Sequence, residues 1–494
     1  MIQPIHWPDI ELGGLGKYNS PFQRGKRERV LKLTFHASAL ENLSKEDTDA
    51  LSAIFGLNGH NDLDYVTMRF NDFPSAGTHA LPKETLEAIF AGNTDHIPQM
   101  RIRYYQPEDK NVPIVTWDGK KTFGQTFITD PAALGILASH LVGIDDTSHP
   151  KVKAMLDDLL IISLHQQENR DILVTTSPMM LGSKEHVVKS ANPRTPTEAA
   201  KIVGLFLRSR NDYTFKFENS VRIGTNRGAF YWVLMRHSLP SMWRYYSGCV
   251  MAEDHRKDRT LYLGLSILNR CSRALEARDA IGIGFYNKQN NDTRDSTVFH
   301  FDYLTLLLAG AFDALARAIY RVYQFSKPKG YLTQLQFRKK EYLKELKNKG
   351  ANKLIEYVSQ PAVQALLEIV YNLRNTIHGA SLTSLSVKPQ ILKEEYSFIT
   401  LSPDLEKIFT QNIQPHYDPD AWGLTQFHVL SFEPYTLAST LIRESFQIID
   451  RIASETDITR LFPSKNNLLQ LIEKPPEEDF LFNESTSNLI SALG

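Results

Sequence analysis

The residues best suited to acid–base and phosphate chemistry lie close together in the segment 371-YNLRNTIHGASL-382. Arg374, Asn375 and His378 fall within five consecutive positions. An imidazole gains and loses a proton near neutral pH, and a guanidinium can hold a phosphate through parallel N–H groups. On a helix, a spacing of four residues lets Arg374 and His378 contact each other. The nearby cation disfavours the imidazolium, so His378 would be available as a base.

The residues before this segment predict one amphipathic helix over 361–378. Its apolar residues recur at steps of three and four, at Val363, Leu366, Leu367, Val370, Leu373 and Ile377. Helical phase puts Arg374 near the middle of this apolar stripe and His378 at its edge. A guanidinium on a buried face costs several kcal/mol unless it is paired or reaches water. We therefore expect Arg374 to line a cleft, to meet a carboxylate or to meet a second subunit.

An apolar segment upstream, 303–320, supplies a carboxylate for this arginine. It carries Asp313 and Arg317, and we interpret it as a buried helix and not as a membrane span. Asp313 could balance Arg374, or it could pair with Arg317 one turn away in its own helix.

A lysine-rich connector, 327–353, lies between these two predicted helices. It has nine Lys or Arg and two Glu, whereas the whole chain is neutral, with 56 basic and 56 acidic residues. Interleaved aromatics, Tyr331, Phe337 and Tyr342, would suit a surface for single-stranded nucleic acid. The alternative is a solvated helix face. The residues expected to contact RNA are Lys327, Lys329, Arg338, Lys339 and Lys340.

Taken together, 301-FDYLTLLLAGAFDALARAIY-320 and 368-EIVYNLRNTIHGASL-382 resemble the HEPN superfamily of helical bundles. In that family an Arg and a His come from one helix, usually with a polar residue after the Arg. Many members are metal-independent endoribonucleases that dimerise, so that two Arg–His pairs form one site, and others are inactive binding or assembly modules. Three residues separate Arg374 from His378, which is fewer than is usual in the family, although both still share one helix face.

The resemblance implies a role for each residue of the segment. His378 would take the proton from a ribose 2′-hydroxyl or protonate the leaving 5′-oxygen. Arg374 would hold the scissile phosphate, and Asn375 would orient the pair. The products would be a 2′,3′-cyclic phosphate and a 5′-hydroxyl, with no metal or cofactor, and the partners would be RNA and a second copy of the chain. Phage defence or a toxin system would be the setting in bacteria. The alternative is a non-catalytic HEPN-like module for dimerisation, RNA binding or ligand binding.

A length of 494 residues predicts more than one domain, and the patterns along the chain divide it into two main regions. Strand-like and helical patterns alternate over 1–245, an α+β region of unrecognised role that could hold two subdomains. Helical periods dominate 255–455, which we interpret as an all-α HEPN-like bundle, and 463–494 reads as an irregular tail. The expected helices of the bundle are 259–280, 299–324, 334–357, 361–378 and 433–454.

Other features of the sequence offer weaker chemistry. Two cysteines exclude a disulfide framework, and together with an N-terminus unlike a signal peptide they favour the cytoplasm. No His spacing predicts a metal site. The 13-GGLGKY-18 run lacks the pattern of a phosphate loop. Cys249 is expected to be buried, 281-IGIGF-285 to end a helix, and 222–237 to form a strand pair with its aromatics in the core.

Overall fold

The computed structural model divides into two compact units. The N-terminal unit is Met1–Val203 with Lys216–Ile223, and the helical unit is Gly204–Phe215 with Gly224–Gly494. The helical unit therefore begins earlier along the chain than the expected boundary between 245 and 255. The structure describes residues 30–36, 40, 43–70, 99–105, 112–118, 126–127, 131–146, 148–183, 188, 190–218, 221–256, 260–287, 289–325, 336–377, 382–387, 396–426, 430–461 and 484–494.

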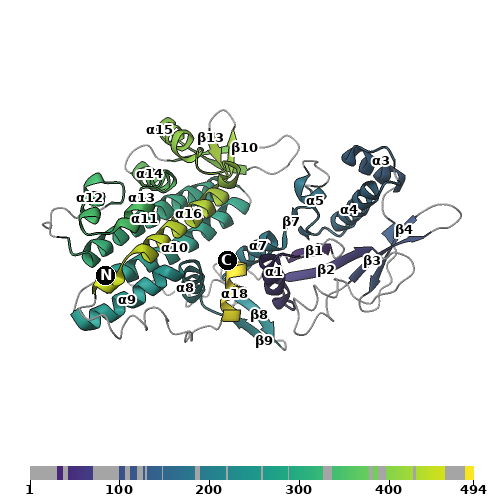
Figure 1. Cartoon of the computed structure of the whole chain (residues 1–494). Coiled ribbons are helices and arrows are strands. Elements are labelled where there is room, and N and C mark those ends of the chain that lie inside the picture. The colour runs from purple at the N-terminus through teal and green to yellow at the C-terminus, as the bar shows by residue number, and fades with distance from the viewer. Residues whose placement is uncertain are drawn as a thin grey trace, which may run out of the picture. The chain divides into compact units, whose positions relative to one another are not determined.

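A seven-stranded sheet with the order β5-β4-β3-β2-β1-β6-β7 forms the centre of the N-terminal unit (Figure 1). The strands are β1 Leu31–His36, β2 Leu63–Phe70, β3 Gln99–Tyr105, β4 Val112–Asp118, β5 Thr126–Phe127, β6 Ile172–Val174 and β7 Pro193–Arg194. The pairs β3–β2, β2–β1, β1–β6 and β6–β7 are parallel. Strands β4 and β5 extend the sheet beyond β3 by antiparallel pairing. The region predicted as α+β thus has a parallel centre of the kind that alternating strands and helices build.

Two helices of this unit begin where the sequence predicts a cap, because 44-SKED-47 and 195-TPTE-198 each place a Ser or Thr before a helical run with an acid in its first turn. The helices of the unit are α1 Lys45–Gly56, α3 Pro131–Val142, α4 Pro150–Gln167, α5 Pro178–Gly182 and α7 Pro196–Arg208, which continues into the helical unit. Ser44 accepts a hydrogen bond from the Asp47 backbone and caps α1, as predicted. At the start of α7, Thr195 and Glu198 each bond the other's backbone N–H, which is a capping box.

Long helices lying side by side form the helical unit (Figure 1). They are α8 Arg227–Ser238, α9 Pro240–Arg256, α10 Thr260–Tyr286, α11 Asn291–Val322, α12 Lys340–Asn348, α13 Asn352–Val358, α14 Pro361–Thr376, α15 Pro403–Ile408, α16 Pro434–Glu455 and α18 Glu484–Leu493. Helix α11 is long and apolar enough to cross a membrane, but 56% of its most apolar window is buried inside the protein. Such burial is typical of the core helix of a soluble protein.

Several boundaries in this unit differ from prediction. Helix α11 begins at 291, eight residues before the expected start at 299, because Asn290 and Thr293 form a capping box. The 334–357 helix is two helices, α12 and α13. The 281–285 glycines lie inside α10, where a Cβ on Gly282 would stand 2.6 Å from the ring of Tyr435, so they permit close helix packing.

The strand pair predicted over 222–237 is wrong for most of its length. Only β8 Thr214–Glu218 and β9 Val221–Gly224 are strands, and α8 follows. Asn226 caps α8 by accepting from the Ala229 backbone, and the helix buries Phe230 and Tyr231. The aromatics are in the core as predicted, but on a helix.

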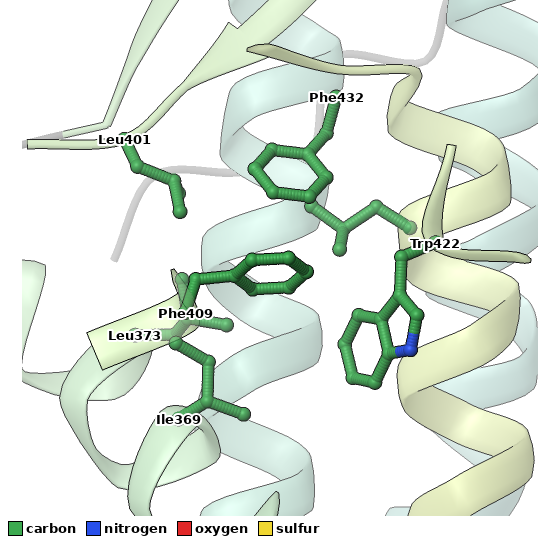
Figure 2. Close-up of a pocket in the computed structure, with 7 residues that line it drawn as sticks. Ile369, Leu373, Leu401, Phe409, Trp422 and Phe432 are labelled. Carbon is green, nitrogen blue, oxygen red and sulfur yellow. The ribbon is translucent and has the colours of Figure 1, made fainter. Parts of the chain in front are cut away.

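A small antiparallel sheet interrupts the unit that the sequence predicts as all-α. Its order is β10-β11-β13-β12, from β10 Thr383–Val387, β11 Tyr396–Thr400, β12 Leu424–Gln426 and β13 Leu430–Phe432. A π-helical segment, Phe409–Ile413, lies between β11 and β12 in the chain. Figure 2 shows the hollow between this segment, the sheet and the helices, with only apolar lining. Its lining residues are Ile369, Leu373, Leu401, Phe409, Trp422, Phe432 and Leu437.

The end of the tail, predicted to be irregular, is helix α18. Its last residues contact a buried charge cluster, in which Arg208 and Arg278 both pair with Asp279. Arg208 donates to the carbonyl of Leu493, and Arg278 donates to that of Gly494. The 462–483 part of the tail lies outside the described residues.

Candidate functional site

Helix α14 presents the predicted Arg374 at the edge of the bundle. Pro361 at its first turn favours the helical start, and the apolar stripe is buried as predicted. The helix ends at Thr376, so the predicted helical range was two residues too long. The Arg374 side chain is 27% exposed, and Asn375 is exposed beside it. Arg374 therefore reaches solvent although it rises from a buried stripe.

The carboxylate that Arg374 meets is Asp313 of α11. Arg374 Nη1 lies 3.3 Å from Asp313 Oδ2, and the Asp313 side chain is 26% exposed. Of the two partners that the sequence allowed for Asp313, the structure therefore gives Arg374. Arg374 Nη2 also lies 3.4 Å from Asn375 Oδ1. These contacts leave guanidinium N–H groups that can bind an anion from solvent.

The buried Tyr371 fixes the position of this carboxylate through a hydrogen bond. It is 1% exposed, its hydroxyl donates to Asp313 Oδ1 over 2.7 Å, and its ring centroid lies 5.0 Å from the Arg374 guanidinium carbon. Burial, followed by the adjacent Asp313 charge, raises the pKa of Tyr371 well above its ordinary value. The phenol therefore stays protonated and acts as a fixed hydrogen-bond donor.

A second guanidinium comes from the lysine-rich connector. The Arg338 guanidinium carbon lies 5.4 Å from the ring centroid of Tyr371, so two arginines approach the same tyrosine. Of the other expected RNA-binding residues, Lys339 and Lys340 are exposed, and Lys327 and Lys329 lie outside the described residues. We call Asp313, Arg338, Tyr371 and Arg374 the Arg374 cluster.

The aromatics of the connector do not form the predicted stacking surface. Phe337 and Tyr342 are 0% and 1% exposed, and their ring centroids lie 5.6 Å apart in the core. The Tyr342 hydroxyl donates to the carbonyl of Ala316 on α11. Helical period explains the difference, because α12 turns its aromatic residue inward and its lysines outward. Tyr331 lies outside the described residues.

His378 also lies outside the described residues. The structure therefore brings together Arg374, Asn375, Asp313 and Arg338 of the predicted site, whereas the contact between Arg374 and His378 stays a prediction. The arrangement is chemically suited to an anion with several oxygens, because the Arg374 and Arg338 guanidiniums both lie beside the Tyr371 ring and, among the described residues, a carboxylate pairs with Arg374 only.

A polar cluster that the sequence did not predict lies in the N-terminal unit. His36 ends β1, Thr175 follows β6, and the His36 Nδ1 atom lies 3.2 Å from Thr175 Oγ1. Asp158 of α4 lies 3.8 Å from the same nitrogen and accepts from the Ser177 hydroxyl over 2.7 Å. Burial lowers the pKa of His36 to about 4 and raises that of Asp158 to about 6. We call these four residues the His36 cluster.

The position of the His36 cluster follows from the strand order. The chain extends from β1 to β2 on one side and later adds β6 on the other, so the carboxyl ends of β1 and β6 mark a switch point of the sheet. Parallel sheets commonly bind ligands at such an edge. No motif indicated it, because His36 lies more than a hundred residues before the other three in the chain and the pairing of β1 with β6 brings it to them.

The thiol of Cys249 does not form a candidate site. Cys249 is 0% exposed, which confirms the prediction that it is buried, and the side chains of the nearby Asp254 and His255 are not described. A buried thiol of this kind is more suited to packing than to nucleophilic attack.

Comparison with known proteins does not assign this chain to a family. No protein-family model matches it, no curated protein matches it, and no solved structure matches it. A proposal for the function therefore rests on the geometry of the Arg374 cluster.

Proposed function

We propose that the chain is a metal-independent endoribonuclease of HEPN type, with its active site at the Arg374 cluster. The observation that carries the proposal is the partly exposed Arg374, which contacts Asp313 and Tyr371 at the end of an otherwise apolar helix face. Because Asp313 and Tyr371 already restrict the Arg374 guanidinium, it loses little further conformational entropy when it binds a phosphate.

The proposed roles follow from the residues of the cluster. Arg374 binds the scissile phosphate and stabilises the charge that develops on its oxygens. Arg338 binds the same or a neighbouring phosphate, and Lys339 and Lys340 contact the strand further on. His378 transfers the proton of the ribose 2′-hydroxyl or of the leaving oxygen, and Asn375 orients Arg374. The setting in bacterial phage defence or in a toxin system rests on the HEPN resemblance alone.

A second candidate is a non-catalytic module that binds RNA or another anion. Asp313 favours it, because its carboxylate already takes one side of the Arg374 guanidinium and reduces the local positive charge. In this case Arg374 and Arg338 would bind a phosphate without cleaving the ester.

The test incubates the full chain with end-labelled single-stranded RNA in EDTA and detects 2′,3′-cyclic phosphate ends. Arg374→Ala and His378→Ala are compared with Arg451→Ala, a matched control, because Arg451 also pairs with a carboxylate and lies over a tyrosine ring. We expect each site substitution to lower the cleavage rate roughly a hundredfold or more and the control to keep it.

Two results would refute the proposal that the chain is a nuclease. One is intact RNA at high protein concentration, and the other is equal cleavage by both site variants. Intact RNA that still binds, with affinity lost in Arg374→Ala and kept in Arg451→Ala, would support the binding module instead.

A further inference from the structure

The His36 cluster of the N-terminal unit contains a buried carboxylate and a buried imidazole that do not bond each other. Asp158 Oδ1 lies 3.8 Å from His36 Nδ1, which is too long for a hydrogen bond. The His36 and Asp158 side chains are only 4% and 9% exposed. No ion pair among the described residues brings a lysine or an arginine to Asp158. The carboxylate is therefore withdrawn from water without a permanent positive charge beside it, which is costly unless another partner binds there.

Ser177 fixes the oxygen atoms that surround this gap. Its hydroxyl donates to Asp158 Oδ2 over 2.7 Å, so Oδ1 is the carboxylate oxygen nearest to His36. Its backbone N–H donates to Thr175 Oγ1 over 3.0 Å, and the same Oγ1 lies 3.2 Å from His36 Nδ1. A carboxylate oxygen and a hydroxyl oxygen, both held by Ser177, thus lie close to one imidazole nitrogen.

From this arrangement we propose that the His36 cluster binds a divalent transition-metal ion such as Zn²⁺, with His36 Nδ1, Asp158 Oδ1 and Thr175 Oγ1 as its ligands. Zinc binds nitrogen and oxygen at about 2.0–2.2 Å, and tetrahedral geometry then separates two ligand atoms by about 3.4 Å. The observed separations of 3.2 and 3.8 Å lie on either side of this value, so a small rotation of Asp158 would complete the set. A threonine or serine hydroxyl also ligates the cation in phosphate-loop proteins.

The proposed ion would link three elements that lie far apart in the chain. Its ligands come from the end of β1, from the residue after β6 and from α4. A tetrahedral ion with three protein ligands keeps its fourth position for water, as catalytic metal sites do. The ion would lie at the carboxyl edge of the sheet, where parallel sheets commonly bind ligands. The hydrogen bond from Ser177 to Asp158 is of the kind that orients metal-binding carboxylates.

Two other uses of the same residues fit the geometry less well. In a serine hydrolase the nucleophilic hydroxyl donates to the imidazole, whereas the Ser177 hydroxyl donates to Asp158. A phosphate would be repelled by the Asp158 carboxylate, while a cation would be attracted to it.

The test titrates the full chain, treated with EDTA and then dialysed, with Zn²⁺ in a calorimeter and with Co²⁺ in a spectrophotometer. Bound Co²⁺ is expected to show the visible absorption of a four-coordinate ion. Asp158→Asn and His36→Gln are each expected to raise the dissociation constant for Zn²⁺ about a hundredfold or more, because each removes a ligand. Ser177→Ala releases the carboxylate without removing a ligand and is expected to raise it roughly tenfold.

Two other buried histidines supply matched controls. His165 Nδ1 lies 3.1 Å from a threonine hydroxyl, as His36 Nδ1 does, but no carboxylate forms an ion pair with His165 among the described residues. His60 Nδ1 lies 3.5 Å from Asp62 Oδ2 in the same unit. His165→Asn and Asp62→Asn are expected to keep the affinity of the unmodified chain for Zn²⁺.

A measurement on the unmodified chain makes the test independent of variants that fold poorly. Zn²⁺ is expected to slow hydrogen exchange roughly tenfold in peptides that cover β1, β6 and α4, and EDTA is expected to reverse this protection. The RNA cleavage assay contains EDTA, so the metal site and the proposed nuclease stand or fall separately.

Three results would overturn the inference. The first is the absence of bound Zn²⁺ and Co²⁺ in both titrations. The second is an unchanged affinity for Zn²⁺ in folded Asp158→Asn and Ser177→Ala. The third is a loss of affinity in Asp62→Asn together with protection outside β1, β6 and α4, which would place the ion at His60 instead.

Discussion

Acidification is expected to destabilise the N-terminal unit through a buried histidine that is neutral in the folded state. His165 of α4 is 1% exposed, its Nδ1 lies 3.1 Å from Thr34 Oγ1, and its Nε2 has no partner among the described residues. Burial lowers the pKa of His165 to about 4, with Arg170 acting in the same direction and Asp171 opposing it. Protonation would place a charge between α4 and β1.

The sign and size of the effect follow from proton linkage. The ordinary pKa is 6.5, so between pH 6.5 and 4 the folded state binds fewer protons at His165 than the unfolded state does. The stability present above pH 6.5 is therefore lost as the pH falls through 4. A pKa difference of this size corresponds to about 3 kcal/mol, which is a large part of the stability of a domain.

Neighbouring groups make a single-residue comparison necessary. His36 has a similarly lowered pKa of about 4 and adds to the loss in acid. Asp158 acts in the opposite sense, because its raised pKa of about 6 gives stability below its ordinary value of 3.8 that is lost as the pH rises through 6. The two largely offset each other, so His165 is the residue whose effect can be isolated.

The assay compares wild type with His165→Asn, which keeps a polar side chain within reach of Thr34 and does not titrate. Hydrogen exchange is followed by mass spectrometry on peptides that cover β1 and β6 and is normalised to the intrinsic rate at each pH. Between pH 6.5 and 4 the protection of these peptides is expected to fall roughly a hundredfold more in wild type than in the variant. The same pH dependence in both proteins would refute the reasoning, because His165 would then be protonated in the folded state.

Three further changes test the helical unit. Asp279→Asn leaves the buried Arg208 and the partly buried Arg278 without their carboxylate and is expected to lower the free energy of unfolding by about 3–5 kcal/mol, measured by urea denaturation. Gly282→Ala forces a Cβ against a tyrosine ring of α16 and is expected to cost about 1–3 kcal/mol, whereas Gly228→Ala, whose nearest neighbour would be 3.5 Å away, is expected to stabilise α8 slightly. Tyr371→Phe removes the hydroxyl that holds Asp313, and we expect a loss of about 1 kcal/mol in stability and a lower cleavage rate in the RNA assay.

Local signals in the sequence were sufficient for some elements. The cap at Ser44 and the capping box at Thr195 and Glu198 identified two helix starts, because a cap is satisfied by residues three positions apart. The period of α14 identified its buried face. It also showed that Arg374 would need a partner, and the need for a carboxylate then singled out Asp313.

Other elements depended on contacts that no local pattern records. The aromatic run of α8 has the composition of a strand, but the cap at Asn226 and the burial of Phe230 favour a helix there. The parallel order of the N-terminal sheet is set by pairing between strands far apart, such as β1 with β6, and so the His36 cluster could not be predicted. The exposure of Phe299, Tyr303 and Leu306 on α11 could not be predicted either, because apolar residues on a mostly apolar helix look alike until the neighbouring helices cover one side.

Asp313 limits the positive charge at Arg374, and one variant of it tests whether Arg374 binds RNA. In Asp313→Asn the Arg374 guanidinium loses its ionic partner but keeps a polar neighbour, so the local charge becomes more positive. A phosphate at Arg374 would then compete with a neutral amide, and RNA affinity is expected to rise several-fold, most clearly at low salt. A rise in affinity would support the phosphate site, whereas unchanged RNA binding would show that Arg374 does not contact the strand.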